Sequence, residues 1–352
     1  MRYLPTSRLT PGMALGQDIY DGAGRLLLGR YILLTEEQIS NLEFLGFPGV
    51  YVDDEFSRGI EIQQIVSPEV RRQALKIVYD LFHTDMRKQE PSEAEFKLRK
   101  TVESVVDDVI CNGDIMCNIM DIKSYDDYIY YHSIHVGILS VVVGARLGLP
   151  HDELCQLAAA ALLHDIGKRF IDHDIVRGGK AHRSEKEQEV YRSHPKIGAE
   201  YLRETCRFSA DVYEGIMEHH ECYNGEGYPL GKKGGEIHLF ARIIRIADCY
   251  DAKVSAFPAQ KSLSPSEALE YVMALGDRWF DPDIVAVFAR KVAAYPIGCE
   301  VELSNGQHAV VARNFENFPL RPLVRVVETG EMLNMRDDEK ARAVTVGRLI
   351  VR

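Results

Sequence analysis

The stretch Glu153–Lys168, ELCQLAAAALLHDIGK, joins a run of alanine and leucine to an adjacent His164-Asp165 pair. Its apolar residues recur at helical spacing, and Gly167 marks the point where the predicted helix stops. Neighbouring residues on a helix point about 100 degrees apart, so an adjacent pair can serve one centre only where a helix ends, or two ions at once. We therefore expect a helical domain that presents His164 and Asp165 at the end of a core helix.

The composition narrows the class of protein. A chain of 352 residues with 46% hydrophobic residues can bury one large core and one or two smaller modules. The net charge of −11 argues against a nucleic-acid polymer as partner, because such affinity comes from clustered lysine and arginine. The cysteines form no CxxC pair, which is typical of reduced thiols.

No secretory signal is evident at the amino terminus, and we expect a cytoplasmic protein. The most apolar run, Ile134–Leu149, contains Arg146 and falls short of the roughly 20 apolar residues that a membrane-spanning helix needs. This run therefore predicts a buried helix and no membrane partner.

Three parts follow one another along the chain. Residues 1–65 alternate short apolar runs with Gly and Pro, as is typical of a small β-rich module, and Thr35 begins one short helix that Gly46 ends. Residues 66–295 carry the helical pattern, and helices around 68–110 could support a homodimer or pack within their own chain. An Asn-Gly turn at 305–306 between alternating runs predicts a small antiparallel sheet over 296–352. The expected fold is mainly α, with small β-rich modules at both ends.

Further metal-binding residue types are spread over more than a hundred residues. His194 precedes Pro195, which favours the first turn of a helix. Asp248 lies in an apolar helix, where an unpaired carboxylate would be costly to bury. The expected metal ligands are His132, His164, Asp165, His194, His219, His220 and Asp248, with His135 and Asp251 as weaker candidates. Imidazoles and carboxylates without cysteine suit iron, manganese or zinc in a site that keeps open positions.

Each of these residues also has a simpler explanation, because a single buried histidine is usually a hydrogen-bonded core residue. Two adjacent pairs, each at a helix end, are harder to explain by packing. His219-His220 closes a predicted helix just before the glycine-rich loop NGEGYP at 224–229. Asp165 is our candidate for a carboxylate that bridges two ions roughly 3.5–4 Å apart.

Four motifs together resemble the HD-GYP branch of the HD phosphohydrolases. They are HDIGK at 164–168, a His-Pro at 194–195, HHExxxGxGYP at 219–229 and RIxxxADxxDA at 242–252. The resemblance covers roughly residues 121–290, including DxYxYxH at 126–132 and FDPDIVAVF at 280–288. It implies a helical bundle that holds two or three metal ions, commonly iron or manganese, and hydrolyses cyclic dinucleotides, chiefly cyclic di-GMP.

The resemblance also implies roles for single residues. One ion would be held by His132, His164, Asp165 and Asp248, and the other by Asp165, His194, His219 and His220. Tyr128 stands where members with a third metal have glutamate, so we expect two ions. Lys168 matches a lysine near the scissile phosphate. We expect Lys168, Gly227, Tyr228 and Asp251 to contact substrate, and the loop around Tyr228 is also a candidate contact for a signalling partner.

The expected reaction is an in-line attack on phosphorus by a hydroxide that bridges the two ions. Asp165 and Lys168 are the catalytic candidates, with Lys168 acting electrostatically or as a proton donor. The product would be linear pGpG, GMP or both.

Several positions depart from the family pattern. Phe257 and Gln260 stand where a basic segment usually holds the substrate phosphates, and Asn224 replaces an aspartate. Each lost charge-assisted hydrogen bond costs about 1.5–3 kcal/mol, which weakens binding. Four basic residues elsewhere could replace this charge: Arg177, Lys180, Arg245 and Lys253. His135 is either a packing residue or a partner of a ligand.

The alternative is a metal-bound but slow or silent domain that acts as a cyclic-dinucleotide receptor or protein-interaction module. A mononucleotide phosphohydrolase is a weaker third choice.

Overall fold

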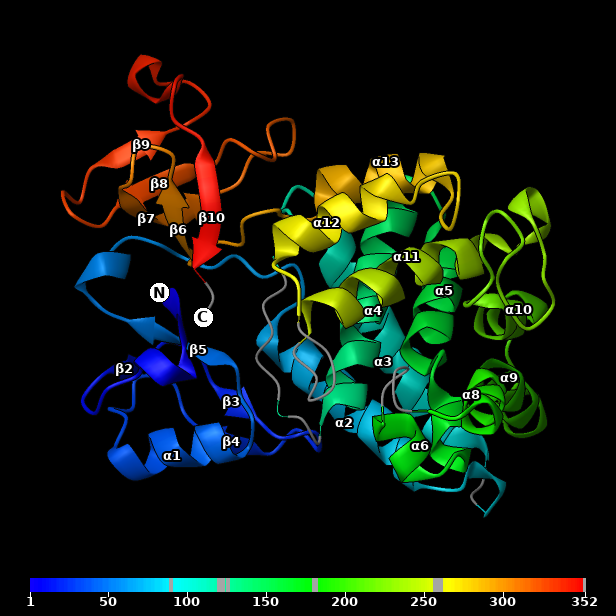
Figure 1. The fold of residues 1–352 in the computed structure, drawn as a ribbon. Coiled ribbons are helices and arrows are strands. Elements are labelled where there is room, and N and C mark those ends of the chain that lie inside the picture. Colours follow the sequence, from blue (N-terminus) through cyan, green and yellow to red (C-terminus); the bar gives the residue numbers. More distant parts are fainter. Residues whose placement is uncertain (89–90, 119–123, 125–126, 179–182, 256–261, 351–352) are drawn as a thin grey trace.

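The structure is a computed structural model that describes residues 1–88, 91–118, 124, 127–178, 183–255 and 262–350. Figure 1 shows a large helical domain beside two small sheets that lie on the same side of it. The fold is mainly α with small antiparallel sheets near both chain ends, as predicted. The exact boundaries at 65 and 295 stay predictions.

The amino-terminal module contains two sheets and one helix. A three-stranded antiparallel sheet has the order β1 (Arg2–Pro5), β5 (Gly49–Asp53) and β2 (Ala14–Leu15), and β3 (Ile19–Tyr20) pairs with β4 (Leu26–Leu28). The helix α1 (Glu36–Phe44) begins where Thr35 and Gln38 cap each other's backbone amides. Gly46 follows with a positive φ of 76°, as expected of a residue that ends a helix.

The carboxy-terminal module is a five-stranded antiparallel sheet. Its strands lie in the order β10 (Val346–Ile350), β6 (Glu300–Leu303), β7 (His308–Arg313), β8 (Leu323–Val326) and β9 (Met332–Asn334). The predicted turn at Asn305 and Gly306 joins β6 to β7, and Gly306 has a positive φ of 82°. The short edge strand β9 was not predicted.

The two β modules pack against each other, which the sequence did not predict. Tyr3 and Tyr51 of the first form a buried cluster with Cys299 of the second. The backbone amide of Tyr3 donates to the carbonyl of Gly298 at 2.8 Å. The guanidinium of Arg2 contacts Glu300 of β6 at 3.4 Å. Residues from both ends of the chain therefore form one joint unit.

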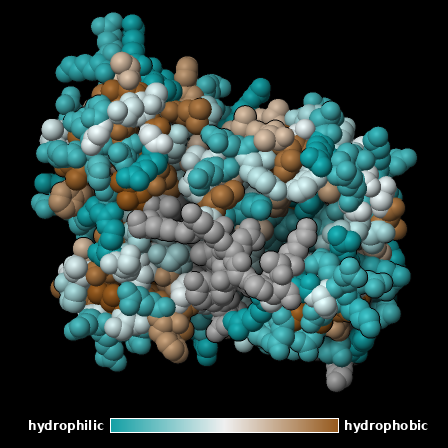
Figure 2. Space-filling model, viewed as in Figure 1, coloured by the Kyte–Doolittle hydropathy of each residue, from teal (hydrophilic) through white to brown (hydrophobic). Residues whose placement is uncertain are grey.

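One continuous apolar core holds the helical domain together. Its longer helices are α2 (Pro68–His83), α3 (Pro91–Cys111), α4 (Tyr128–Arg146), α5 (His151–Leu163), α9 (His194–Thr205) and α11 (Leu239–Val254). The shorter ones are α6 (His173–Arg177), α8 (Glu185–Arg192), α10 (Ala210–Glu218), α12 (Pro265–Ala274), α13 (Pro282–Lys291) and the 3-10 turns η4 (Ile166–Phe170) and η5 (Gly234–Glu236). On the face in Figure 2, hydrophilic residues dominate and apolar residues occur in small groups.

Helix α4 is the centre of this bundle and packs against α2, α3, α5, α11 and α13. Its length and composition would allow it to cross a membrane, but 78% of its most apolar window is buried inside the protein. This burial is typical of a core helix, as predicted for the run at 134–149. A Cβ at Gly137 would lie 2.8 Å from Leu162 Cδ2, so glycine allows α4 and α5 to approach closely.

Candidate metal centre

Four helix ends and two helix interiors bring the predicted ligands together. His164 and Asp165 lie between α5 and η4, His194 begins α9, and the pair His219-His220 follows α10. The helical interiors of α4 and α11 supply His132 and Asp248. All seven side chains are buried or nearly so; His220 is the most exposed, at 13%.

The first cluster consists of His132, His164 and Asp165, whose ligand atoms lie within 4.8 Å of one another. Asp165 Oδ2 lies 3.4 Å from His164 Nε2 and 3.8 Å from His132 Nε2. Asp248 Oδ1 lies 3.2 Å from the same nitrogen of His132. These four residues are the predicted set for one ion.

The second cluster consists of His194, His219 and His220, again within 4.8 Å. The Nε2 atoms of His194 and His219 lie 3.3 Å apart, and they are 3.3 and 3.9 Å from Asp165 Oδ1. Asp165 therefore turns one carboxylate oxygen toward each cluster, which is the arrangement of a bridging ligand. The ligation itself stays a prediction.

The donor atoms fit divalent metal ions. Three of these histidines donate Nδ1–H to backbone carbonyls: His164 to Ala161 at 2.8 Å, His194 to Tyr191 at 2.7 Å and His219 to Ile216 at 2.6 Å. Their Nε2 lone pairs consequently point into the centre. His164 Nε2, Asp165 Oδ1 and His220 Nε2 are buried without a hydrogen-bond partner. Bound cations would satisfy these orphaned atoms. Imidazoles and carboxylates suit iron, manganese or zinc alike.

Asp251 lies behind the centre rather than on its open side. It is fully buried and accepts from His132 Nδ1 at 2.7 Å and from His135 Nδ1 at 2.9 Å. This carboxylate–histidine arrangement fixes the tautomer that leaves His132 Nε2 free for a metal. This position argues against the predicted contact of Asp251 with substrate. The role that it indicates for Asp251 is to orient the ring of His132. His135 is thus a partner of this carboxylate rather than a mere packing residue.

The charges around the centre shift the pKa values of its members. Burial alone would lower the pKa of His132, but hydrogen bonds to Asp248 and Asp251 outweigh it and raise the pKa to about 9. Burial opposes ionisation of Asp165, yet the neighbouring His164 and Lys168 hold its pKa well below the usual value. Burial likewise lowers the pKa of His219 and His220, so these rings are neutral donors.

Lys168 and Tyr128 both lie beside the first cluster. Lys168 forms an ion pair with Asp165 Oδ2, so its ammonium lies at the first cluster, and its contact with substrate stays a prediction. Tyr128 stacks on His132 with ring centroids 5.2 Å apart. Burial raises the pKa of the Tyr128 phenol well above its usual value, so the phenol is neutral at pH 7. The expectation of two ions rather than three stays a prediction.

Two glycines set the close approaches at the centre. A Cβ on Gly167 would lie 2.0 Å from the carbonyl oxygen of His194, so only glycine lets η4 touch the start of α9. A Cβ on Gly227 would lie 2.2 Å from the amide nitrogen of Cys222. Gly227 therefore lets the loop at 224–229 fold back on the segment after His220, and its predicted contact with substrate stays a prediction.

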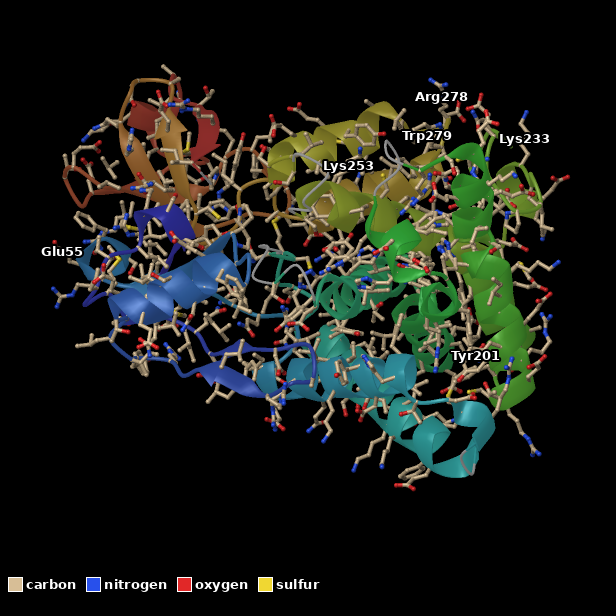
Figure 3. The ribbon with its side chains drawn as sticks, turned by 60° about the horizontal axis from the view of Figure 1, so that its bottom comes forward. Glu55, Tyr201, Lys233, Lys253, Arg278 and Trp279 are labelled. Carbon is tan, nitrogen blue, oxygen red and sulfur yellow. The ribbon has the colours of Figure 1, made fainter. Side chains whose placement is uncertain are left out.

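Buried glutamates that the sequence analysis missed hold this loop. Glu221 Oε1 accepts from the amides of Leu230 at 2.6 Å and Gly231 at 3.1 Å. Glu218 pairs with Lys232. In Figure 3, Lys233, Arg278 and Trp279 mark this end of the molecule, where the Trp279 carbonyl accepts from the amide of Tyr223. The signal that could have found Glu218 and Glu221 is their adjacency to the double histidine.

Aromatic and basic side chains line the edge of the second cluster. Tyr228 stacks on His220 with centroids 4.8 Å apart. The guanidinium of Arg192 lies 5.3 Å from the Tyr228 ring, and Arg183 lies 3.6 Å from the Tyr191 ring. The sequence analysis named neither arginine, because each precedes a motif rather than belonging to it.

The four basic residues that could replace the missing charge do not all lie at the centre. Arg245 lies within the centre, 3.7 Å from Asp248 Oδ2. Lys253 lies over the Tyr271 ring at 4.7 Å, toward α12 (Figure 3). Arg177 is exposed at the end of α6. Lys180, Phe257 and Gln260 lie outside the described residues.

Comparisons with known proteins agree with this geometry. Residues 118–284 match the model of the HD domain family. The cyclic di-GMP phosphodiesterase PA4108 of Pseudomonas aeruginosa is 33% identical over 226 residues, 64% of this chain and 54% of that protein. The response regulator RpfG of Xanthomonas campestris, also named a cyclic di-GMP phosphodiesterase, is 39% identical over 151 residues, 42% of this chain and 39% of that protein.

A solved structure has the same fold. Bd1817, described as a HDG"Y"P protein from Bdellovibrio bacteriovorus, aligns with a TM-score of 0.52 at 17% identity, covering 82% of this chain and 97% of that one. The chain spans about half or less of the length of the two curated relatives above.

The central helical region, residues 118–284, is similar to the HD domain family and carries the clustered His and Asp donors. The same region is similar to relatives that are named cyclic di-GMP phosphodiesterases.

Proposed function

We propose that this protein is a metal-dependent phosphodiesterase that hydrolyses a cyclic dinucleotide, with cyclic di-GMP as the first candidate. The observation that carries the proposal is Asp165, which turns one oxygen toward each of two histidine clusters. Relatives named for hydrolysis of cyclic di-GMP and of 3'3'-cGAMP support the substrate class.

Two bound divalent ions would supply a hydroxide at neutral pH and neutralise charge on the phosphoryl oxygens. Asp165, which turns one oxygen toward each cluster, would be shared by the two ions. Lys168 lies beside Asp165 with a pKa that burial would lower but the carboxylate raises, so it stays protonated at neutral pH. A protonated Lys168 can stabilise the charged phosphate or donate a proton to the leaving oxygen. The expected products are linear pGpG, GMP or both.

The edge of the second cluster suits a nucleotide. Tyr191 and Tyr228 are half-buried aromatic rings at this edge, and Arg192 offers a guanidinium for a phosphate. Arg192 is exposed at the end of α8, so its side chain is accessible to a ligand. This residue is our candidate for part of the charge missing at positions 257 and 260.

The test is hydrolysis by the purified chain loaded anaerobically with iron or manganese. Cyclic di-GMP and 3'3'-cGAMP are offered separately, and products are separated by chromatography. We expect turnover that Asp165→Ala abolishes and that Asp152→Ala retains, since the Asp152 side chain is 99% exposed at the start of α5. Metal-loaded protein that hydrolyses neither compound contradicts the proposal.

A silent receptor is the second candidate, motivated by Phe257 and Gln260 at the usual basic positions. It predicts saturable binding of cyclic di-GMP to the metal-loaded chain without any product, measured by calorimetry. A signalling partner at the GYP loop, a homodimer and a cytoplasmic location stay predictions of the sequence analysis.

A further inference from the structure

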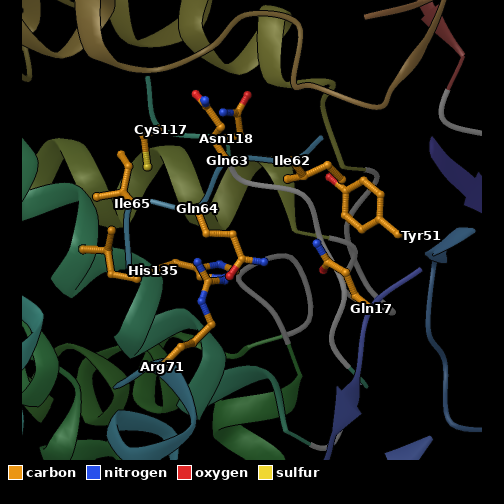
Figure 4. A pocket seen from close by; sticks show the side chains of 11 residues that line it. Gln17, Tyr51, Ile62, Gln63, Gln64, Ile65, Arg71, Cys117, Asn118 and His135 are labelled. Carbon is orange, nitrogen blue, oxygen red and sulfur yellow. The ribbon is translucent and has the colours of Figure 1, made fainter. Parts of the chain in front are cut away.

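A cavity of about 50 Å³ lies where the amino-terminal module meets the helical domain. Its described walls come from both parts of the chain, as Figure 4 shows. They are Gln17, Tyr51, Ile62, Gln63, Gln64, Ile65, Arg71, Cys117, Asn118, His135 and Ile138. Apart from His135, a weaker ligand candidate that the structure places behind the centre, none of these eleven residues is a predicted metal ligand.

Arg71, in the first turns of α2, is the one strongly basic group among these described walls. Its Nε is buried without a hydrogen-bond partner, and within the described part of the chain the guanidinium forms no ion pair. The groups that act on it electrostatically are Cys117, Tyr131 and Tyr51. Burial raises the pKa values of these three groups, so they are neutral at pH 7. Among the described residues, the charge of Arg71 therefore has no counter-ion.

An uncompensated guanidinium at a cavity is costly unless something else neutralises it. The other polar walls are side-chain amides, the imidazole of His135, the Tyr51 hydroxyl and the Cys117 thiol, and no carboxylate stands among the eleven. The amide N–H groups can donate to an anion, whereas His135 already donates Nδ1–H to Asp251. The Oε1 atom of Gln64 is also buried without a hydrogen-bond partner. A guanidinium with surrounding amides matches the geometry of a carboxylate or a phosphate group.

We propose that this cavity binds a small oxyanion, the carboxylate or phosphate group of a ligand, through Arg71 and the amides around it. A water needs roughly 10–15 Å³ of such space, so the cavity holds a few waters or one oxyanion group, not a whole nucleotide. The rest of a larger ligand would extend past Gln63, which is exposed.

The position of the cavity connects it to the metal centre. His135 forms part of its wall and donates to Asp251 Oδ1 at 2.9 Å. The other oxygen of Asp251 accepts from His132, so two hydrogen bonds link His135 in the cavity wall to a predicted ligand. By linkage, an anion that shifts His135 changes metal affinity, and metal changes anion affinity by the same factor.

The first experiment measures anion binding by thermal shift and calorimetry at constant ionic strength. Sodium phosphate, sodium acetate and sodium chloride are the three probes. We expect saturable stabilisation by phosphate or acetate but not by chloride, and the stronger of the two identifies the group. Equal stabilisation by all three salts overturns the proposal.

The matched variants are Arg71→Gln and Arg72→Gln. Arg72 is exposed and pairs with Glu69 at 2.7 Å, so its loss serves as the control. Arg71→Gln is expected to weaken anion binding at least about tenfold, while Arg72→Gln binds as the unaltered protein does. Both variants keep the metal centre, so binding of phosphate to metal ions cancels between them. Equal anion affinity in the two variants overturns the proposal.

A stability measurement separates an anion site from a structural arginine. In chloride alone, Arg71→Gln removes an uncompensated charge and is expected to melt no lower than the unaltered protein. Melting at a lower temperature together with unchanged anion binding shows a structural arginine and refutes the site. Finally, metal affinity measured by chelator competition should change about fivefold or more on anion saturation. An unchanged metal affinity overturns the link to the centre.

Discussion

Replacing Gly167 by alanine tests whether the two ligand clusters depend on direct contact between η4 and α9. The added Cβ would lie 2.0 Å from the His194 carbonyl oxygen and 2.8 Å from the Gly198 amide nitrogen. An ordinary contact begins at 3.4 Å, so one backbone must move by about 1.4 Å in a close-packed interior. Metal sites tolerate errors of only about 0.2 Å in ligand distance. The shift would separate His194 from Asp165 and open the second cluster.

The expected result for Gly167→Ala is loss of the second ion and a fall in phosphodiesterase rate of at least about 100-fold. Overpacking costs typically about 1–3 kcal/mol, so the variant is expected to stay folded but melt lower. Metal content is measured by elemental analysis, rate with cyclic di-GMP, and folding by circular dichroism. Gly235→Ala is the matched control, because a Cβ there meets nothing within 4 Å. Two ions per chain and an unchanged rate in Gly167→Ala would refute the reasoning.

Three further predictions concern substrate, ligand orientation and pH. Arg192→Ala is expected to raise KM for cyclic di-GMP about tenfold or more with a smaller change in kcat, whereas Arg203→Ala, which removes an exposed arginine over Tyr213, leaves both constants unchanged in steady-state assays. Asp251→Asn weakens the orientation of His132 and is expected to lower metal affinity about 10–100-fold in chelator competition, and a value equal to that of the unaltered chain contradicts the orienting role. Because the pKa of His132 is raised to about 9, protons compete with metal for this ring below that pH. Metal affinity should therefore rise by about tenfold per pH unit toward pH 9 and then level off. A metal affinity that does not change between pH 6 and about 8 contradicts this competition between the proton and the metal.

Most of the candidate metal ligands could be named from the sequence because they lie at helix ends, which carry local sequence signals. His164-Asp165 and His219-His220 each stand where a helix stops, and local signals such as Gly167 and the glycine-rich loop mark those stops. Ser193 and Pro195 indicated in the same way that a helix, α9, begins at His194. Such signals depend on a few neighbouring residues and therefore survive without knowledge of the tertiary fold.

Contacts between distant segments could not be predicted in this way. Asp251 resembled a substrate contact because it follows Asp248 by three residues, yet the packing of α11 on α4 turns it toward His132 and His135. Arg192 is connected to the second cluster through the ring of Tyr228, which its guanidinium approaches and which stacks on His220. The position of Arg71 likewise depends on how the amino-terminal module sits on the helical domain.

The shared cluster of Tyr3, Tyr51 and Cys299 has a consequence for shortening the chain. Deleting residues 296–352 would expose the two tyrosine rings to water, and deleting residues 1–65 would expose Cys299 and Leu349, the carboxy-terminal members of the same cluster. Either deletion alone would leave an exposed apolar surface that promotes aggregation. The helical domain also depends on the carboxy-terminal module, because the buried ammonium of Lys291 pairs with Glu316 at 2.9 Å, so the full chain is the unit to express.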